Sequence, residues 1–351
     1  MRSLFTKVRR LARDPDLAID LGTANTRIYA SGIGIVAEEP SLVPIHSEKV
    51  EAIAHHAFLL PTHGMVAPLR AGVVVDTDAA TLLLKSLFQR VRRFGLVRPR
   101  ILTCAPTDTS EKERNAIAEA AHRAGGAEVA IIPEPWAAAI GAGLDVASPY
   151  AQMLVDIGDG VTDIAILRDG RIIKTAAIRK GCSDLKAALR DMVLEQYAVW
   201  LPSREVERLT QDVDAIHHPI PRVITVVTGL HLKTKRTTRL KIHRLEVIVV
   251  MEPIVRKILC AIQTTLRKLP PEIACEVFES GICLTGGGSC IRGMDWLIAN
   301  STRLEVRTPK DPLRSVINGA IQTLQYGAQS ESWWRQVAWP LSPATQTALD
   351  F

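Results

Sequence analysis

The sequence predicts an α/β protein built from two similar lobes. The strongest observation is a repeated pattern of Asp, aliphatic, Gly, any, small, any, Thr, any and Ile, which begins at Asp20 and again at Asp156. Each copy follows a short apolar run and precedes alternating apolar residues, which is typical of a strand, a tight turn and a returning strand. The chain has 351 residues, enough for two domains with separate cores. We therefore expect a duplicated fold in which each lobe has a mixed sheet, flanking helices and a smaller insertion.

Composition narrows the class of protein. Hydrophobic residues make up 47% of the chain and aromatic residues 5%, which is typical of a soluble α/β protein. The apolar runs fall short of the roughly 20 residues that span a bilayer, and the N-terminus lacks the apolar core of a secretory signal. The six cysteines have no metal-ligand spacing, so we expect them to be free thiols.

In the first half, short apolar runs predict strands and amphipathic runs predict helices. A helix is expected over 76–94, with Asp78 as its N-cap. A second helix begins at a capping box formed by Ser110 and Glu113 and ends at Gly125–Gly126. The other expected elements are strands over 17–19, 34–38, 41–45, 101–105 and 129–132, and an Ala-rich helix over 135–143.

The second half repeats this order. Three strands form a meander in which Asp169–Gly170 is a hairpin turn. Two helices, a basic β-rich insertion and a third helix follow, and then a strand that leads into a glycine-rich turn over 285–289. Residues 328–351, which contain three tryptophans, are expected to form an irregular tail. The expected strands are 153–157, 162–167, 171–178, 222–227, 240–242 and 281–284, and the expected helices are 184–197, 203–212 and 255–269.

Residues 1–13 are predicted to form an amphipathic helix. Five basic residues and no acid accompany an apolar stripe at helical spacing. Such a segment suits a helix that lies in a membrane interface, where basic residues attract anionic lipid. A helix docked on its own domain, or a frayed basic tail, would give the same pattern. The stripe consists of Leu4, Phe5, Val8 and Leu11.

A second basic stretch lies between 215 and 245, where seven Lys or Arg residues occur without an acid. A basic run is most often a solvated face, although it also attracts anionic partners. Aromatic residues that would stack on bases are absent from this stretch. Nucleic acid is therefore not expected as a partner.

With these motifs in this order, the chain resembles the actin-like ATPases, and most closely the MreB family of bacterial rod-shape cytoskeletal proteins. The resemblance covers about residues 15–326 and implies a duplicated, actin-like (ribonuclease H-like) fold with two lobes and four subdomains. The segments that carry it are Asp20-Leu-Gly-Thr-Ala-Asn-Thr26, Ile35-Val-Ala-Glu-Glu-Pro-Ser41, Gly72-Val-Val-Val-Asp76, Glu134-Pro-Trp-Ala-Ala-Ala-Ile-Gly-Ala-Gly143 and Leu284-Thr-Gly-Gly-Gly-Ser-Cys-Ile-Arg-Gly293.

The resemblance also implies a domain organisation. After the N-terminal helix over 1–13, a first lobe is expected over 14–145, with a small insertion at about 33–74. A second lobe is expected over 146–318, with a small insertion at about 182–245. Residues 319–351 would then supply a helix that returns to the first lobe, followed by the tail.

The residues of an ATP site with Mg²⁺ follow from the same resemblance. Asp20 and Asp156 would hold Mg²⁺ through water, and Glu134 would position the attacking water. The glycine-rich turn would let the adenosine lie against backbone, next to a helix that carries further contacts. The implied phosphate-binding residues are Gly22, Thr23, Ala24 and Asn25 in the first turn and Gly158, Asp159, Gly160 and Val161 in the second. The implied adenosine-side residues are Glu207, Arg208, Thr210, Gly286, Gly287, Gly288 and Ser289.

Three departures from the family pattern suggest a divergent paralogue and a slow ATPase. The second turn has Asp159 and Val161 where MreB-like chains usually have Gly and Thr, although actin has a similar sequence there. Thr210 stands where the adenosine-side helix usually has Lys, so we expect weaker nucleotide affinity or an altered base preference. Cys182 and Ser183 replace a Gly and an Asp after Gly181.

The function that this resemblance implies is that of an ATP-binding filament protein of the bacterial cytoskeleton. It would associate with itself in filaments, lie in the cytoplasm at the inner face of the membrane, and determine cell shape by guiding membrane-embedded wall-synthesis proteins. An organelle- or plasmid-positioning filament, or a scaffold that does not hydrolyse ATP, is the alternative. A small-molecule kinase is less favoured, because no dedicated acid besides Glu134 is found for it.

Overall fold

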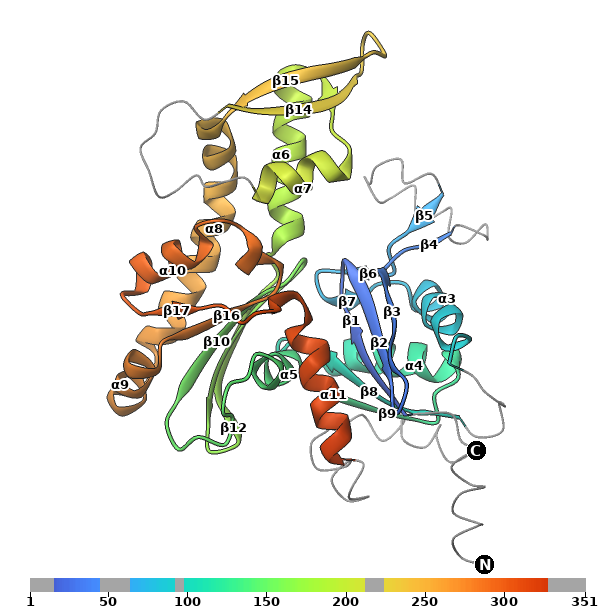
Figure 1. The fold of residues 1–351 in the computed structure, drawn as a ribbon, viewed down its shortest axis with the longest axis vertical. Helices are drawn as coiled ribbons and strands as arrows, with labels where there is room; N and C mark the ends of the chain where they lie inside the picture. Colours follow the sequence, from blue (N-terminus) through green and yellow to red (C-terminus); the bar gives the residue numbers. More distant parts are fainter. Residues whose placement is uncertain (1–15, 45–63, 92–97, 212–223, 328–351) are drawn as a thin grey trace, which may run out of the picture. The chain divides into compact units, whose positions relative to one another are not determined.

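The computed structural model describes residues 16–44, 64–91, 98–211 and 224–327. They fall into two compact units. Unit 1 draws on Met1–Gly141 and Val316–Phe351, and unit 2 on Ala142–Ser315. Unit 1 is therefore formed by two separate segments of the chain, and each unit has its own sheet (Figure 1).

The sheet of unit 1 has five strands in the order β3-β2-β1-β8-β9. The first three run antiparallel, as the predicted hairpin requires, and β8 and β9 continue the sheet in parallel with β1. Short strand pairs β4–β5 and β6–β7 stand beside it. The bounds are β1 Leu17–Leu21, β2 Asn25–Ala30, β3 Gly34–Pro40, β4 Val43–Pro44, β5 Met65–Val66, β6 Leu69–Arg70, β7 Val73–Val74, β8 Arg100–Ala105 and β9 Glu128–Pro133.

Two pairs of helices accompany this sheet. Helices α3 (Thr77–Phe88) and α4 (Glu111–Ala124) cover one face, and α5 (Glu134–Gly141) and α11 (Ser315–Gly327) lie on the other side (Figure 1). Contact between α5 and α11 is very close. A Cβ added to Gly319 of α11 would lie 1.7 Å from the backbone oxygen of Ala137 in α5, so only glycine fits there.

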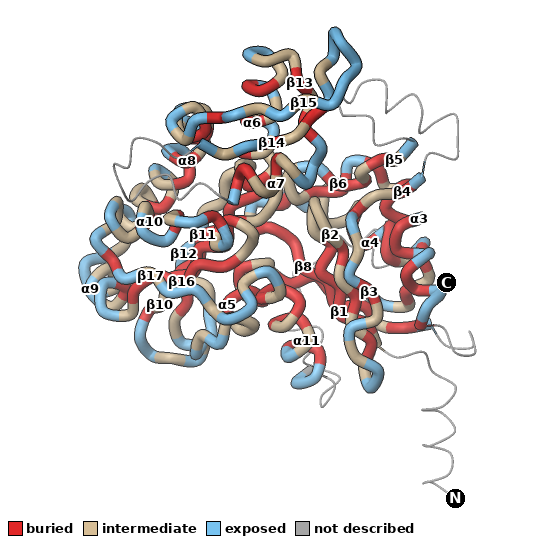
Figure 2. The backbone as a smooth tube through the Cα atoms, turned by 45° about the horizontal axis from the view of Figure 1, so that its top comes forward, coloured by how far each residue is buried: buried red, intermediate tan, exposed pale blue. Residues whose placement is uncertain are grey.

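Side chains along β1 alternate between the two faces of this sheet. Leu17, Ile19 and Leu21 pack into the cluster shared with α3 and α4. Asp20 therefore faces the other side of the sheet, because successive side chains of a strand point to opposite faces. Figure 2 shows that β1 and β8 are buried along their length, which explains why both read as nearly continuous apolar runs.

The sheet of unit 2 repeats this topology in the order β12-β11-β10-β16-β17. Again the first three strands are antiparallel, and the next two are parallel to β10. The predicted duplication is thereby confirmed. The bounds are β10 Gln152–Ile157, β11 Thr162–Arg168, β12 Arg171–Ile178, β16 Ile282–Thr285 and β17 Val306–Arg307.

The rest of unit 2 consists of helices and one small sheet of three strands, β13-β14-β15. These strands follow or join helices that share the core of the main sheet. The bounds are α6 Cys182–Tyr197, β13 Val199–Trp200, α7 Ser203–Gln211, β14 Ile224–His231, β15 Thr237–His243, α8 Arg244–Arg267, α9 Pro271–Ser280, η1 Gly287–Cys290, α10 Met294–Thr302 and η2 Pro312–Arg314.

Several predicted boundaries were wrong. The N-cap of α3 is Asp76 and not Asp78, because the Asp76 side chain accepts the hydrogen bond from the Ala79 amide at 2.9 Å. The helix ends at Phe88, short of the predicted end. Helix α8 begins eleven residues before the predicted start and runs through Pro253.

No helix among the described residues is long and apolar enough to cross a membrane. The predicted membrane-binding helix over 1–13 and the tryptophan-rich tail over 328–351 both lie outside the described residues.

Candidate functional site

The first repeated motif forms a braced turn at the end of β1. The Gly22 amide donates to the Asn25 carbonyl at 3.1 Å, which closes the turn. Ser41 holds it from one side, since its hydroxyl donates to the Gly22 carbonyl at 2.6 Å and its amide donates to the Ala24 carbonyl at 2.9 Å. The Gly72 amide donates to the Thr23 hydroxyl at 2.9 Å. Two distant segments of the chain thus fix the conformation of this turn.

Two carboxylates and one thiol lie beside this turn, at the carboxyl ends of three neighbouring strands. Asp20 is the last residue but one of β1, Cys104 lies near the end of β8, and Glu134 follows β9 as the first residue of α5. Burial raises the pKa of the Cys104 thiol well above its ordinary value, and the charges of Asp20 and Glu134 raise it further. Asp20 and Glu134 therefore both lie near the Cys104 thiol.

Asp20 forms an ion pair with Arg27. The Arg27 Nη1 atom lies 3.0 Å from Asp20 Oδ2, and the Arg27 Nε atom lies 2.9 Å from Glu38 Oε1. Arg27 is the cross-strand partner of Asp20 in the β1–β2 pair, so both side chains face the same side of the sheet. Burial raises the pKa of Asp20 above its ordinary value, although Arg27 opposes this shift.

The second repeated motif forms a turn with the same closing bond. The Gly158 amide donates to the Val161 carbonyl at 2.9 Å, which corresponds to the bond between Gly22 and Asn25. The start of α6 is attached to this turn, because the Cys182 amide donates to the Gly158 carbonyl at 3.0 Å and the Ser183 amide to the Asp159 carbonyl at 2.8 Å.

The glycine-rich turn packs against the end of β10. The Thr285 hydroxyl donates to Asp156 Oδ1 at 2.8 Å. Gly286 has a φ of +77°, and a Cβ at this position would lie 2.4 Å from the Ile157 carbonyl oxygen. The Ser289 hydroxyl donates to the Gly286 carbonyl at 2.6 Å. Only glycine allows this backbone to approach the strand so closely.

The predicted residues of α7 have different surroundings. Glu207 reaches the second turn through Lys186 of α6, whose Nζ atom lies 2.7 Å from Glu207 Oε2 and 3.3 Å from Asp159 Oδ1. Arg208 pairs with Glu205 at 2.8 Å and donates to the Val226 carbonyl.

Thr210 is buried, and its hydroxyl donates to the Val206 carbonyl of its own helix at 2.8 Å. No cation therefore comes from position 210, and the structure places the ammonium group of Lys186 beside Glu207 of the same helix instead.

The predicted sites thus form one group in each unit. Unit 1 brings together Asp20, the turn Gly22–Asn25 and Glu134, and unit 2 brings together Asp156, the turn Gly158–Val161, Glu207 and Gly286–Ser289. The predictions missed Arg27, Ser41, Cys104 and Lys186. Arg27 was detectable, because the register of a hairpin closed at Gly22–Asn25 sets it opposite Asp20.

The residues fit a hydrated Mg²⁺ better than a site made of protein ligands alone. Within 16–44, 64–91, 98–211 and 224–327, no group of three or more His, Cys, Asp or Glu side chains is arranged to hold a metal. Unit 1 instead offers the buried carboxylate of Asp20 near the end of β1, and unit 2 offers that of Asp156 near the end of β10. Mg²⁺ prefers oxygen ligands and keeps several waters, so single carboxylates suit it.

Comparison with known proteins gives consistent results. The model of the family described as MreB/Mbl protein matches residues 14–332. The cell shape-determining protein MreB of Escherichia coli is 34% identical over 324 residues, which cover 88% of this chain and 93% of that protein. The cell shape-determining protein Mbl of Bacillus subtilis is 31% identical over 312 residues, covering 87% and 94%.

Solved structures show the same fold. The crystal structure of MreB5 of Spiroplasma citri bound to AMPPNP superposes with a TM-score of 0.78 at 28% identity and covers 90% of this chain and 98% of that one. The MamK double helical filament has a TM-score of 0.72 at 20% identity, covers 88% of this chain and 99% of that one, and supports the fold alone. The predicted actin-like fold is confirmed.

Proposed function

Because this chain belongs to the MreB/Mbl family, we propose that it is an ATP-binding protein of the bacterial cytoskeleton that forms actin-like filaments and determines cell shape. Its relatives are named as cell shape-determining proteins, and the similar MreB5 of Spiroplasma citri has been solved with AMPPNP and with ADP. The proposal extends the binding of nucleotide and the assembly of filaments to this chain.

The duplicated turn is the observation that carries this proposal. Each turn ends a central strand, is closed by the same amide-to-carbonyl bond and follows a buried aspartate. Glycine at the start of each turn lets backbone N–H groups approach an anion closely. We assign the phosphates of ATP to the turns Gly22–Asn25 and Gly158–Val161, and the adenosine side to Gly286–Ser289 and Glu207.

The same assignment gives roles to the acidic residues. Asp20 and Asp156 would hold Mg²⁺ through water, and the ion would supply positive charge for the phosphates. Glu134 accepts a hydrogen bond from the attacking water and orients it. Hydrolysis then depends on positioning and on charge, and it is slow.

A calorimetric titration of the full chain with ATP and Mg²⁺ tests nucleotide binding. We expect saturable binding by the wild type, and heats no larger than dilution at high micromolar ATP would refute the proposal. Glu134→Gln is expected to bind ATP as the wild type does and to release phosphate about a hundredfold more slowly, because the neutral amide is a weaker hydrogen-bond acceptor and orients the attacking water less well. Equal phosphate release would remove Glu134 from the reaction.

For membrane association, the proposal rests on residues 1–13, with Leu4, Phe5, Val8 and Leu11 entering the lipid. A chain lacking residues 2–13 is expected to assemble with ATP as the full chain does, but to stop sedimenting with vesicles that contain anionic lipid. Many weak anchors on one filament bind strongly together, so the loss is expected to be large. Unchanged sedimentation with the vesicles contradicts the anchoring. Filaments at the inner membrane face would be placed to guide membrane-embedded wall-synthesis proteins.

A further inference from the structure

A basic side chain is shared by two carboxylates beside the turn in unit 1. Arg27 contacts Asp20 at 3.0 Å and Glu38 at 2.9 Å, and the side chains of Arg27 and Asp20 are only 11% and 10% exposed. Arg27 lies on β2, two residues after Asn25, which is the last residue of the turn. A guanidinium is charged at every pH that the fold tolerates, so this positive charge is permanent.

Unit 2 has an equivalent arrangement that comes from different elements. Lys186 of α6 contacts Asp159 in the turn at 3.3 Å and Glu207 of α7 at 2.7 Å, with its own side chain 25% exposed. Burial lowers the pKa of Lys186, but the two carboxylates raise it by more, so the net direction is upward. Lys186 is therefore charged at neutral pH.

These two cations matter because each turn is assigned to a polyanion. Each cation pairs with two carboxylates, so each of these groups of three side chains has a net charge of −1, to which Glu134 in unit 1 and Asp156 in unit 2 add further negative charge. Without the cation, two carboxylates would stand beside a turn that receives phosphates, and their repulsion would oppose binding. Both cations are poorly exposed, so salt screens their effect less than that of a surface pair.

We propose that Arg27 and Lys186 supply part of the charge neutralisation that ATP needs in this protein, so that ATP binding depends only partly on Mg²⁺. The inference rests on the proposed function, since it takes the turns as the phosphate sites. It also accounts for Thr210, because the cation absent from position 210 of α7 is supplied from α6 by Lys186.

The test measures ATP affinity of the full chain by calorimetry, once with Mg²⁺ and once with excess EDTA. We expect the wild type to bind in EDTA within about tenfold of its affinity with Mg²⁺. Arg27→Leu and Lys186→Met are expected to lose about tenfold to a hundredfold in EDTA, as for a lost charged hydrogen bond, and much less with Mg²⁺. Lys186→Arg keeps the charge and is expected to keep the affinity in EDTA.

Removal of a carboxylate is expected to have the opposite effect on ATP affinity. Glu38→Gln and Asp159→Asn each delete a negative charge beside a turn, so both are expected to bind ATP more tightly than the wild type in EDTA. A merely structural role for these ion pairs predicts weaker binding for every variant, in EDTA and with Mg²⁺ alike, and this result would overturn the inference.

Matched controls come from ion pairs away from the turns. Arg100 lies 2.6 Å from Asp16, with side chains 18% and 15% exposed, in the same sheet as Arg27, and Arg256 pairs with Glu252 on α8. Arg100→Leu and Arg256→Met are expected to leave the ratio of the two affinities unchanged. Thermal unfolding followed by circular dichroism identifies any variant that fails to fold, and Arg27→Lys then replaces Arg27→Leu as the test of charge.

The outcomes separate the two claims. Wild-type binding with Mg²⁺ but none in EDTA overturns this inference and leaves the proposed function intact. Absence of binding with Mg²⁺ overturns the proposed function, and this inference with it.

Discussion

At the scale of single residues, the buried carboxylate of Asp20 lowers the stability of its own unit. Its carboxylate is buried, and burial raises its pKa even though Arg27 is 3.0 Å away. The charged form is therefore held at a cost in free energy when no ligand is bound. A bound cation would recover that cost, so ligand binding and stability are coupled through this one side chain.

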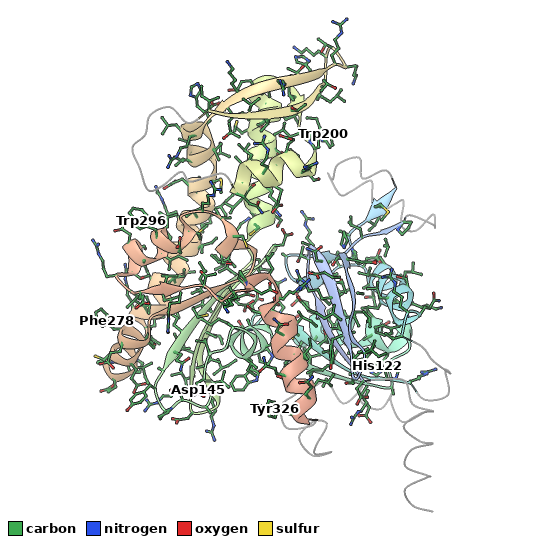
Figure 3. All side chains as sticks on the ribbon, in the orientation of Figure 1. His122, Asp145, Trp200, Phe278, Trp296 and Tyr326 are labelled. Carbon is green, nitrogen blue, oxygen red and sulfur yellow. The ribbon has the colours of Figure 1, made fainter. Side chains whose placement is uncertain are left out.

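His122 in α4 gives a pH-dependent stability that is unrelated to the site (Figure 3). Its Nδ1 atom lies 3.2 Å from the Gly126 carbonyl, and its buried Nε2 atom has no hydrogen-bond partner among the described residues. Burial lowers the pKa of His122, and nearby Arg98 lowers it further, while the Gly126 contact raises it. Protonation would place an unpaired N–H in the interior.

The direction in which stability changes with pH follows from this lowered pKa. Between the folded pKa and the ordinary value of about 6.5, the unfolded chain binds more protons, so stability rises with pH in that window and is lost as pH falls through it. Urea unfolding at about pH 7 and pH 5 is expected to show a larger loss of stability in acid for the wild type than for His122→Gln, whose side-chain amide can donate to the Gly126 carbonyl but does not titrate. Parallel losses would exclude His122 as the group responsible.

At the scale of elements, α4 has an N-terminus whose stability depends on two side chains. The Glu113 amide donates to the Ser110 hydroxyl at 3.3 Å, and the Ser110 amide donates to Glu113 Oε2 at 2.8 Å. Ser110→Ala removes one half of this capping box and is expected to lower the free energy of unfolding by about 1 kcal/mol. Chemical denaturation measures the change, with Lys112→Ala in the exposed first turn as the control. A loss no larger than that of the control would show that the box contributes little.

This cap and both hairpin turns were predictable because their determinants are local. The capping box needs residues three apart, and each hairpin needs a glycine turn between apolar runs. The start of helix α8 was mispredicted because a proline usually stands in the first turn of a helix. Here Pro253 lies inside the helix, which begins at Arg244. Helix α9 was missed although Pro271 and Gly281 mark its two ends.

Long-range contacts were not predictable in this way. Lys186 meets Asp159 and Glu207 only once α6, α7 and the second turn are packed together, and no spacing in the sequence encodes that meeting. The same holds for Gly319, whose need for glycine comes from the backbone of Ala137 in another segment of unit 1. Sequence patterns thus predicted the turns and their aspartates, but not the basic side chains that pair with the carboxylates beside the turns.

At the scale of the whole molecule, the duplication makes a prediction that concerns both units at once. Asp20 and Asp156 occupy equivalent strand ends in sheets of equivalent order. They differ in surroundings, since Arg27 is the cross-strand partner of Asp20 and Asp163 is that of Asp156. If both carboxylates act on the same bound nucleotide and metal ion, their contributions to binding are coupled and do not add.

A double-mutant cycle measures this coupling. Asp20→Asn and Asp156→Asn are each expected to weaken ATP binding in Mg²⁺ by about tenfold or more, as for other charged contacts. The double variant is expected to lose much less than the product of the two single losses, because the first substitution already releases the ion that the second would have held. In EDTA the coupling is expected to vanish. Single losses that multiply in Mg²⁺ as well would mean that the two aspartates act independently, and the assignment of both to one metal ion would fail.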